Sequence, residues 1–523
     1  MKRFCIISAI LLAAATFSAG AQGVEDALRY SQQFYVGSAR TMAMGNAFTA
    51  LGGDLGAIAI NPASSALYNC CEFALTAGLS WDKNTADFYT TEGTYSSLAG
   101  PDRKRFTVPN ISTTFSVPTG RSGLVSYSFG IGYNKLNNFN SHVAFSGNDN
   151  GTSLLGGIAA GLEGVSSSYL QDLNAFNIGY CTPQEIMAWD AYLIAPYVDE
   201  EGYSYDDSYI GATENYFLDG GLGVNNAMYK DLDLTTGGGI YDMSLNFGLN
   251  FFDRLYLGAN VNINIVNFEE NLRYSEQATA GNYFQSGFKS MDYTYWQRTD
   301  GAGVNLQLGA ILIPVDFLRL GVSYTTKTVY DLTDSWHETM TSGFDGSNPE
   351  YASFESESPY RDYDYRIHAP KRLSLGGALV FGKVGLISAD YEKVDYATTV
   401  MTDTEGAGFD DVNSDIRNYC YSCNIIRLGG ELNIFGGTSL RAGYNRYVYD
   451  APAYQYLSFG LGQRISENSS IDLAFRTRLD DYYEMRPYDD YAYTEAGIAQ
   501  CVAPYAGISN SAYDVMLTYR VKF

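Results

Sequence analysis

The final stretch of the chain, "AYDVMLTYRVKF" from Ala512 to Phe523, alternates strictly between apolar and mostly polar side chains. Successive side chains of a β-strand point to opposite faces, so this pattern predicts a strand with one apolar face. The same alternation recurs near residues 255–265, 440–445 and 471–478. Segments of about 10 residues can cross a membrane as tilted strands, whereas soluble sandwich strands are commonly shorter.

Fourteen such segments can be placed along the chain, and their connections have a regular rhythm. Short turns, such as Asp253-Arg254 and Gly382-Lys383, alternate with long loops, of which the largest spans 134–239. Tight turns at one rim and long loops at the other are typical of outer-membrane barrels, and an even strand number leaves no open edge. The sequence therefore predicts an all-β membrane protein, a 14-stranded antiparallel transmembrane β-barrel over residues 72–523. The expected strands are 72–81, 108–117, 123–133, 240–252, 255–267, 303–313, 318–327, 372–381, 384–393, 424–434, 438–447, 455–464, 470–479 and 512–523.

Composition agrees with a β-rich membrane protein. The 523 residues include 54 Gly, 45 Tyr and 28 Phe, which suits strands with aromatic belts. After residue 22 no stretch approaches the roughly 18–20 apolar residues that a transmembrane helix requires. The net charge of −25 argues against nucleic acid as a partner, because nucleic acid requires a basic surface.

The first 21 residues have the pattern of a secretory signal peptide. Met1-Lys2-Arg3 is basic, the run from Phe4 to Phe17 is apolar, and Ala19-Gly20-Ala21 fits the small-x-small cleavage rule. A membrane helix is the alternative interpretation, but the run is too short for one. Export together with a barrel predicts the outer membrane of a Gram-negative bacterium.

Residues 22–71 do not alternate, and we expect them to form a small helical plug. Ala39 to Ala50 suits a short helix, Gly52-Gly53-Asp54 interrupts it, and Leu55 to Ile60 forms a second turn that Asn61-Pro62 ends. Small residues of this kind suit a barrel lumen, where the backbone must approach the wall closely.

The stretch from Gly37 to Leu67 resembles the N-terminal plug of the FadL family, outer-membrane transporters of long-chain fatty acids and other hydrophobic compounds. The residues that match the family pattern are Gly37, Arg40, Met44, Gly45, Ala47, Ala50, Asp54, Ala57, Asn61, Pro62 and Ala63, and Ser64 departs from it. The resemblance implies fourteen strands around a plug, and release of the solute through a lateral opening linked to a kinked strand. The aromatic end at Phe523 resembles that of outer-membrane barrels in general, which implies recognition by the barrel assembly machinery.

Catalytic and metal-binding patterns are weak in this sequence. His142, His337 and His368 fall in predicted loops, and no Gly-x-Ser-x-Gly elbow is present, so we predict no enzyme. The lone Cys420-Tyr-Ser-Cys423 lacks a second pair or a nearby His, which predicts no metal and no cofactor. A local disulfide and free thiols both remain open there, as does the pairing of Cys181 and Cys501. The acidic run 199–201 lacks the spacing of a calcium loop.

The loop 134–239 contains apolar stripes with helical spacing. These stripes either pack on each other as an extracellular cap or form a groove that captures an apolar molecule, and the two can coexist. The candidate capture residues are Leu154, Leu155, Ile158, Leu162, Leu170, Leu173, Phe176, Ile186 and Trp189.

Four arginines, Arg441, Arg476, Arg478 and Arg520, are predicted to face the lumen. They could bind a substrate carboxylate or pair with lumenal acids such as Asp472 and Asp514. Gly130 and Gly132 would permit a kink in the third strand.

The predicted function is transport of hydrophobic small molecules such as long-chain fatty acids across the outer membrane, with outer-membrane lipid around the barrel. Capture at the extracellular loops, a lumen pocket and plug-gated release would be its steps. The alternative is a platform of a protein-secretion system. The plug argues against a general diffusion porin.

Overall fold

The computed structural model describes residues 23–97, 103–199, 201–216, 222–223, 227–281, 284–346, 352–404, 408–449, 454–479, 481–492 and 501–523. The predicted signal peptide, 1–21, lies outside the described residues.

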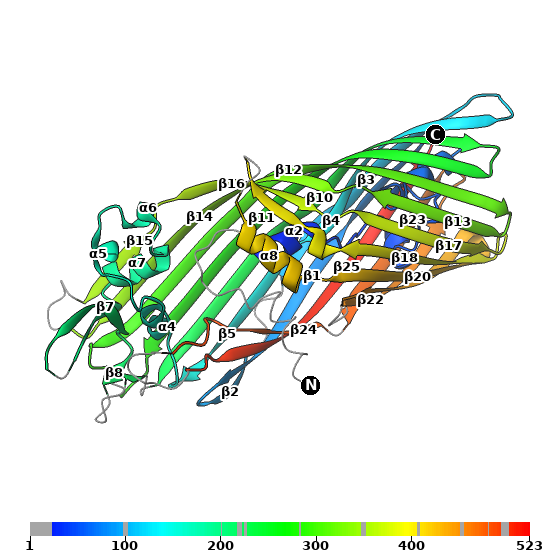
Figure 1. The fold of residues 1–523 in the computed structure, drawn as a ribbon. Coiled ribbons are helices and arrows are strands. Elements are labelled where there is room, and N and C mark those ends of the chain that lie inside the picture. The colour runs from blue at the N-terminus through cyan, green and yellow to red at the C-terminus, as the bar shows by residue number, and fades with distance from the viewer. Residues whose placement is uncertain are drawn as a thin grey trace.

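The strands form a closed, 14-stranded antiparallel barrel, as predicted (Figure 1). The wall follows chain order through β1 (Glu72–Thr90), β3 (Arg103–Pro118), β4 (Leu124–Asn138) continued by β5 (Ser141–Asp149), β10 (Met228–Phe251), β11 (Leu255–Ala278), β12 (Phe288–Val315), β13 (Leu318–Thr325) continued by β14 (Thr328–Phe344), β16 (Arg361–Ala369) continued by β17 (Arg372–Val380), β18 (Gly385–Asp395), β20 (Ser422–Ile434), β21 (Thr438–Val448), β22 (Tyr454–Arg464), β23 (Ser469–Leu479) and β25 (Tyr505–Lys522).

Shorter strands extend hairpins or form small separate sheets. They are β2 (Gly93–Ser97), β6 (Ile194–Val198), β7 (Ser204–Gly211), β8 (Asn215–Tyr216), β9 (Leu222–Gly223), β15 (Ser353–Glu357), β19 (Val400–Asp403) and β24 (Asp481–Met485).

The predicted seam between the last and first strands is confirmed. β25 pairs with β1 from Glu72 opposite Lys522 to Tyr89 opposite Tyr505. The Phe523 amide donates to the Cys71 carbonyl at 3.0 Å, just beyond the ladder. The barrel therefore has no free edge where the chain begins and ends its wall.

The strand lengths differ from prediction, and so does the largest loop. β10 and β11 each run 24 residues and β12 runs 28, so the residues near 228–239, 268–278 and 288–302 are strand rather than loop. Within the predicted 134–239 loop, β4, β5 and β10 together leave only 150–227 outside the barrel wall. His142, His337 and His368 likewise lie on strands β5, β14 and β16.

These extensions escaped prediction because their outer faces are polar. Arg273 pairs with Asp292 at 2.8 Å and Arg366 with Asp331 at 2.7 Å across neighbouring strands. Water, not lipid, contacts such a face, so the apolar outer face of a membrane strand is lost while the hydrogen-bonded ladder continues. In Figure 1 the extended strands reach the left end of the barrel, which we call the loop end. The tight hairpins lie at the right end, which we call the turn end.

Within the barrel, one face of each strand is apolar and exposed, and the other is polar and buried. Phe129, Ile131, Leu245, Val261 and Leu306 are among the exposed outer residues. Inside, Asn246 bonds Asn260 at 2.6 Å and Asn260 donates to Gln307 at 3.0 Å. This is the arrangement of a barrel in lipid with a polar lumen. Among the described residues, no helix has the length and apolar character to traverse a bilayer.

The plug lies in the lumen and consists of α2 (Val24–Ser31), α3 (Ala39–Ala43), η1 (Leu55–Ala59) and η2 (Pro62–Leu67). Ser38 caps α3 by accepting from the Thr41 amide at 3.2 Å. The predicted helix 39–50 ends at Ala43, because Gly45 and Asn46 both have positive φ and terminate it.

Glycines in the wall make room for the plug. At Gly443 of β21, for example, a Cβ would collide with the backbone of Met44 and Gly45, two plug residues that pack against this strand. The same holds at other wall glycines, where the collision would be with Ala43, Met44, Thr49, Asn61 or Pro62; these are Gly258, Gly309, Gly321, Gly429 and Gly460. The abundance of glycine thus partly reflects this close approach.

The loop end carries a cap built from α4 (Leu154–Gly161), α5 (Ser168–Gln171), α6 (Ala175–Ile178) and α7 (Pro183–Asp190), seen beside β7 and β15 in Figure 1. Of the remaining elements, α8 (Asp410–Tyr419) contacts both α2 and η4 (Tyr396–Thr398), and η5 (Phe435–Gly437) forms the turn between β20 and β21.

Candidate functional site

A cavity of about 340 Å³ lies in the lumen above the plug. Its floor is the first part of the plug, from Glu25 to Val36, and its sides come from β1, β4 and the loop-end halves of β22, β23 and β25. Most of its surface is aromatic or apolar. The apolar and aromatic lining residues include Leu28, Phe34, Val36, Trp81, Phe139, Tyr396, Tyr449, Tyr454, Tyr456 and Tyr482.

Phe34 holds the aromatic wall together from the plug side. Its ring lies 5.0 Å from that of Tyr447 and 5.7 Å from that of Tyr454, the second pair edge to face. Aromatic pairs in this geometry stabilise beyond simple burial. The plug therefore forms part of the binding surface as well as closing the barrel.

The same plug segment is docked on β4 by main-chain bonds. The Phe34 amide donates to the Leu136 carbonyl at 2.8 Å, and the Val36 amide donates to the Lys135 carbonyl at 3.3 Å. Asn137 donates to the Gln32 carbonyl at 3.3 Å. Movement of this stretch of plug would thus require breaking bonds to β4.

Beside this contact the pairing of the wall is interrupted. β3 pairs with β4 only from Asn110 opposite Asn134 to Pro118 opposite Ser126. Toward the loop end, residues 103–107 of β3 pair with β1 and, within the described chain, with no second strand. Thr107, Lys135 and the stretch 137–141 line the cavity at this place, so the cavity reaches the gap.

Three local features produce this gap. Pro109 lies in a bulge of β3 against β1 and has no amide to donate to β4. Leu136 is an extra residue of β4, since Tyr241 faces Lys135 and Ile240 faces Asn137. The strand then breaks between Asn138 and Ser141. The kink is therefore not at Gly130 and Gly132, which sit in regular pairs on both sides.

The four predicted lumenal arginines fall at two different sites. Arg476 and Arg478 line the aromatic cavity, and Arg476 donates to Asp514 at 2.7 Å and stacks on Tyr456. Arg441 and Arg520 lie below the plug, where both bind Asp472, at 2.6 and 2.7 Å. Of the two predicted alternatives, Arg441, Arg476 and Arg520 thus show pairing with Asp472 or Asp514, whereas Arg478 lies 3.9 Å from Asp82.

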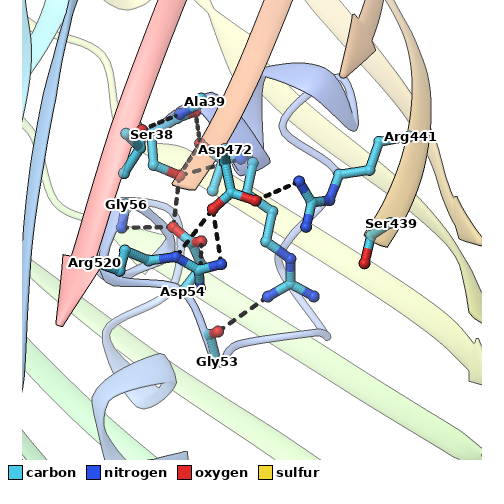
Figure 2. A network of polar contacts seen from close by, with 12 residues as sticks. Ser38, Ala39, Gly53, Asp54, Gly56, Ser439, Arg441, Asp472 and Arg520 are labelled. Carbon is cyan, nitrogen blue, oxygen red and sulfur yellow. Dashed lines mark hydrogen bonds and ion pairs between the residues drawn. The ribbon is translucent and has the colours of Figure 1, made fainter. Parts of the chain in front are cut away.

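Below the plug, alternating charges join plug and wall into one network (Figure 2). Arg40 of the plug binds Glu431 with two bonds of 2.8 and 3.1 Å, and Arg441 joins the same carboxylate at 2.6 Å. Asp472 lies between Arg441 and Arg520, and Arg520 reaches Asp54 of the plug at 3.6 Å. Asp54 in turn accepts from Ser38 and from the Gly56 amide. We call Arg40, Asp54, Glu431, Arg441, Asp472 and Arg520 the latch.

The latch borders a second cavity of about 480 Å³ that opens toward the turn end and is lined almost wholly by polar residues. It shares no lining residue with the aromatic cavity. The plug thus separates an apolar chamber above from a polar chamber below.

The remaining plug residues hold its shape. Gly37 has φ of 69°, and a Cβ there would press into Thr41 and the Tyr35 ring. Asn61 caps η2 through the Ala63 amide at 3.0 Å and donates to carbonyls of Thr49, Ala310 and Val322. Pro62 occupies the first turn of η2, while Met44 and Ala63 are fully buried.

The predicted capture residues form the core of the cap. Leu154, Leu155, Ile158, Leu162, Leu170 and Ile186 are buried together, and Phe176 and Trp189 pack against them. None of them lines either of the two cavities. Only Leu173 of this set is exposed, beside exposed Tyr169, Ile178 and Tyr180. A groove formed by the buried members is absent from the described structure, because mutual packing covers their apolar surface.

Within the described chain, Cys70, Cys71, Cys181, Cys420 and Cys423 carry free thiols. Burial raises the pKa of the Cys181 thiol to about 11, which keeps it protonated.

Removing one latch carboxylate should loosen the plug. We expect Glu431→Ala to leave Arg40 and Arg441 without their shared partner, at a cost of about 3–5 kcal/mol for an uncompensated buried charge. The measurement is the rate at which trypsin cleaves the plug in detergent-solubilised barrel. Asn433→Ala, a polar change in the same chamber, is the control and should leave the rate unchanged; equal rates for both variants would show that the latch does not hold the plug.

The fold is shared with two solved structures. A FadL homologue from Pseudomonas aeruginosa superposes with a TM-score of 0.53 at 12% identity, covering 94% of this chain and 100% of that chain. The toluene transporter TodX from Pseudomonas putida superposes with a TM-score of 0.50 at 15% identity, covering 94% and 99%. No family model matches the sequence, and no curated protein matches it significantly. The resemblance seen in the plug motif is thus confirmed at the level of the fold.

Proposed function

We propose that this barrel transports hydrophobic small molecules across the outer membrane of a Gram-negative bacterium. The observation that carries the proposal is the aromatic cavity, which lies between the loop end and the plug and reaches a gap in the wall. A water-filled pore would offer an apolar solute nothing to bind, whereas burial here stabilises it by about 25 cal/mol for each Å² removed from water. The shared fold with a FadL homologue and a toluene transporter supports this choice.

The route we propose has three stages. The solute first meets the exposed apolar side chains of the cap, Tyr169, Leu173, Ile178 and Tyr180. It then enters the aromatic cavity, whose floor is the plug. It leaves sideways through the gap between β3 and β4 into lipid, which avoids the polar chamber below.

We further propose that the protein is not an enzyme. Both superposed structures are described as a FadL homologue and a transporter. Recognition of β25 by the barrel assembly machinery, and long-chain fatty acids as one solute, belong to the same proposal.

Filling the cavity should block transport. Ala512 lines the cavity opposite Asp82, so Ala512→Trp should lower uptake of labelled oleate about tenfold by occupying the solute's space. The matched control is Ala77→Trp: Ala77 faces Leu517, which is exposed on the lipid side, so uptake should not change. Native mass spectrometry of the purified barrel should also show an apolar ligand. Normal uptake by the Ala512→Trp variant would exclude this cavity from the route.

A further inference from the structure

Three lysines on the outer wall of the barrel form no ion pair. Lys327 lies where β13 passes into β14, Lys371 directly precedes β17, and Lys393 lies near the end of β18. All three side chains are exposed, and among the described residues their ammonium groups make neither an ion pair nor a hydrogen bond. The protein has a net charge of −25, so carboxylates are plentiful, and three unpaired cations close together call for an explanation.

Strand register brings the first two lysines together. Lys327 and Lys371 lie on facing segments of two residues each, between the last pair of one ladder and the first pair of the next. These bounding pairs are Thr325 with Arg372 and Thr328 with Ala369. Like charges on neighbouring strands repel each other and lower stability, and a bound anion would remove this repulsion.

Lys393 adds a third charge from the next strand of the wall. Leu373 lies two residues after Lys371 and therefore on the same face of its strand. Leu373 pairs with Lys393 on one side and with Tyr324 on the other. The three ammonium groups thus come from three neighbouring strands of the wall.

The lysines lie at the rim of the lipid-facing band. Toward the turn end the same strands present exposed apolar side chains, such as Val322 and Leu375. Toward the loop end the outer face becomes polar, beginning with the ion pair between Asp331 and Arg366. Tyr324 exposes its ring at this transition, as aromatic residues do where lipid head groups meet water. The three lysines therefore lie at the level of the head groups of the outer leaflet.

The carboxylates nearby leave this positive charge in excess. Asp331 is bound to Arg366 at 2.7 Å, and Glu392 points into the lumen, where two arginines bind it. Asp395 lies two residues beyond Lys393 on the same face and forms no ion pair within the described chain. It sets one negative charge beside the three positive ones.

We propose that Lys327, Lys371 and Lys393 bind the phosphate of a glycolipid in the outer leaflet. A phosphate monoester carries about −1.5 to −2 charges at neutral pH and three acceptor oxygens, which suits three ammonium groups. The acyl chains would lie against Leu373 and the apolar band below it, while the lysine stems extend along the wall to the phosphate. The site is on the outside of the barrel, so it is separate from the proposed transport route.

The test titrates the purified full-length barrel with phosphorylated lipid A and with enzymatically dephosphorylated lipid A. Native mass spectrometry measures how much of each lipid is bound. For wild type we expect the phosphorylated form to bind about 10- to 100-fold more tightly, since each lysine near a membrane surface contributes about a factor of five toward an anionic lipid. Equal binding of the two forms, or binding of neither, would overturn the proposal.

Variants separate a phosphate site from a general effect of charge. Lys327→Gln combined with Lys371→Gln should lower the preference for the phosphorylated form at least about fivefold. Adding Lys393→Gln should abolish the preference, and arginine at all three positions should keep it.

The matched control removes two lysines elsewhere. Lys289→Gln combined with Lys383→Gln changes one exposed lysine near the loop end and one in the turn between β17 and β18. This variant should bind both lipid forms as wild type does. A preference that falls equally in the control would show that only net charge matters, and the site would then be wrong.

A last comparison distinguishes a lipid from free phosphate. Excess sodium phosphate should displace no more bound lipid than sodium chloride of the same ionic strength does. Displacement by phosphate alone would show that the site takes a free anion, against the proposal. None of these outcomes bears on the aromatic cavity, which is tested separately by oleate uptake.

Discussion

Deleting residues 22–60 should convert the closed barrel into an open channel. The plug lies between the aromatic cavity of about 340 Å³ and the polar chamber of about 480 Å³, so its removal should join them into one water-filled passage. We expect single-channel conductance in planar bilayers to rise at least about tenfold, because water-filled barrels of this size conduct ions and plugged ones do not. Cells that express the variant should also admit small polar antibiotics.

The control for this deletion keeps the plug but weakens its attachment. Arg40→Ala removes the two bonds to Glu431 and the bond to the Gly53 carbonyl, so it should give brief openings rather than a permanent channel. Heat-modifiable migration on gels checks that both barrels are folded. If the folded deletion variant conducts no better than wild type, something other than the plug fills the lumen.

The second large effect concerns the wall gap. Deleting Leu136 should remove the bulge, because Lys135 and Asn137 would then be consecutive partners of Tyr241 and Ile240. We expect the strand to straighten and the gap to narrow, because a shift of one residue turns every side chain beyond it to the other face of the strand. Uptake of labelled oleate should then fall at least about tenfold.

Leu136→Met is the matched control, since it keeps the residue count and most of the apolar volume. Leu136 packs with the plug in the core that includes Tyr30 and Ile240, so this variant also tests whether lost packing alone matters. It should transport at a rate near wild type. Uptake that persists in a folded Leu136 deletion variant would mean that solutes leave by another route.

Much of the fold follows from local pattern. The alternation in β25 and β11 identified strands correctly, because lipid imposes an apolar outer face and a polar lumen imposes the opposite one. The turn predicted at Asp253-Arg254 is also present, and Phe252 and Asp253 adopt the positive φ that tight hairpins require. Pattern failed on the extensions of β10, β11, β12 and β14, since their outer faces are polar outside the membrane while inner residues such as Leu232 and Met291 are apolar.

The candidate site was predicted less well, for a physical reason. The apolar stripes of the cap were visible, but periodicity cannot tell a surface that binds a solute from one that binds another helix; in the structure Leu155 and Ile186 bind their neighbours.

The sequence by itself determined the barrel, its seam and the presence of a plug, because these depend on strand period, turn chemistry and the small residues between Gly37 and Ala63. Only the tertiary structure decided where the solute can bind and leave. The cavity takes its lining from residues as distant as Phe34 and Tyr454, and the gap arises where Pro109 on one strand meets the bulge at Leu136 on the next. Such sites depend on register between strands, which one strand's sequence does not contain.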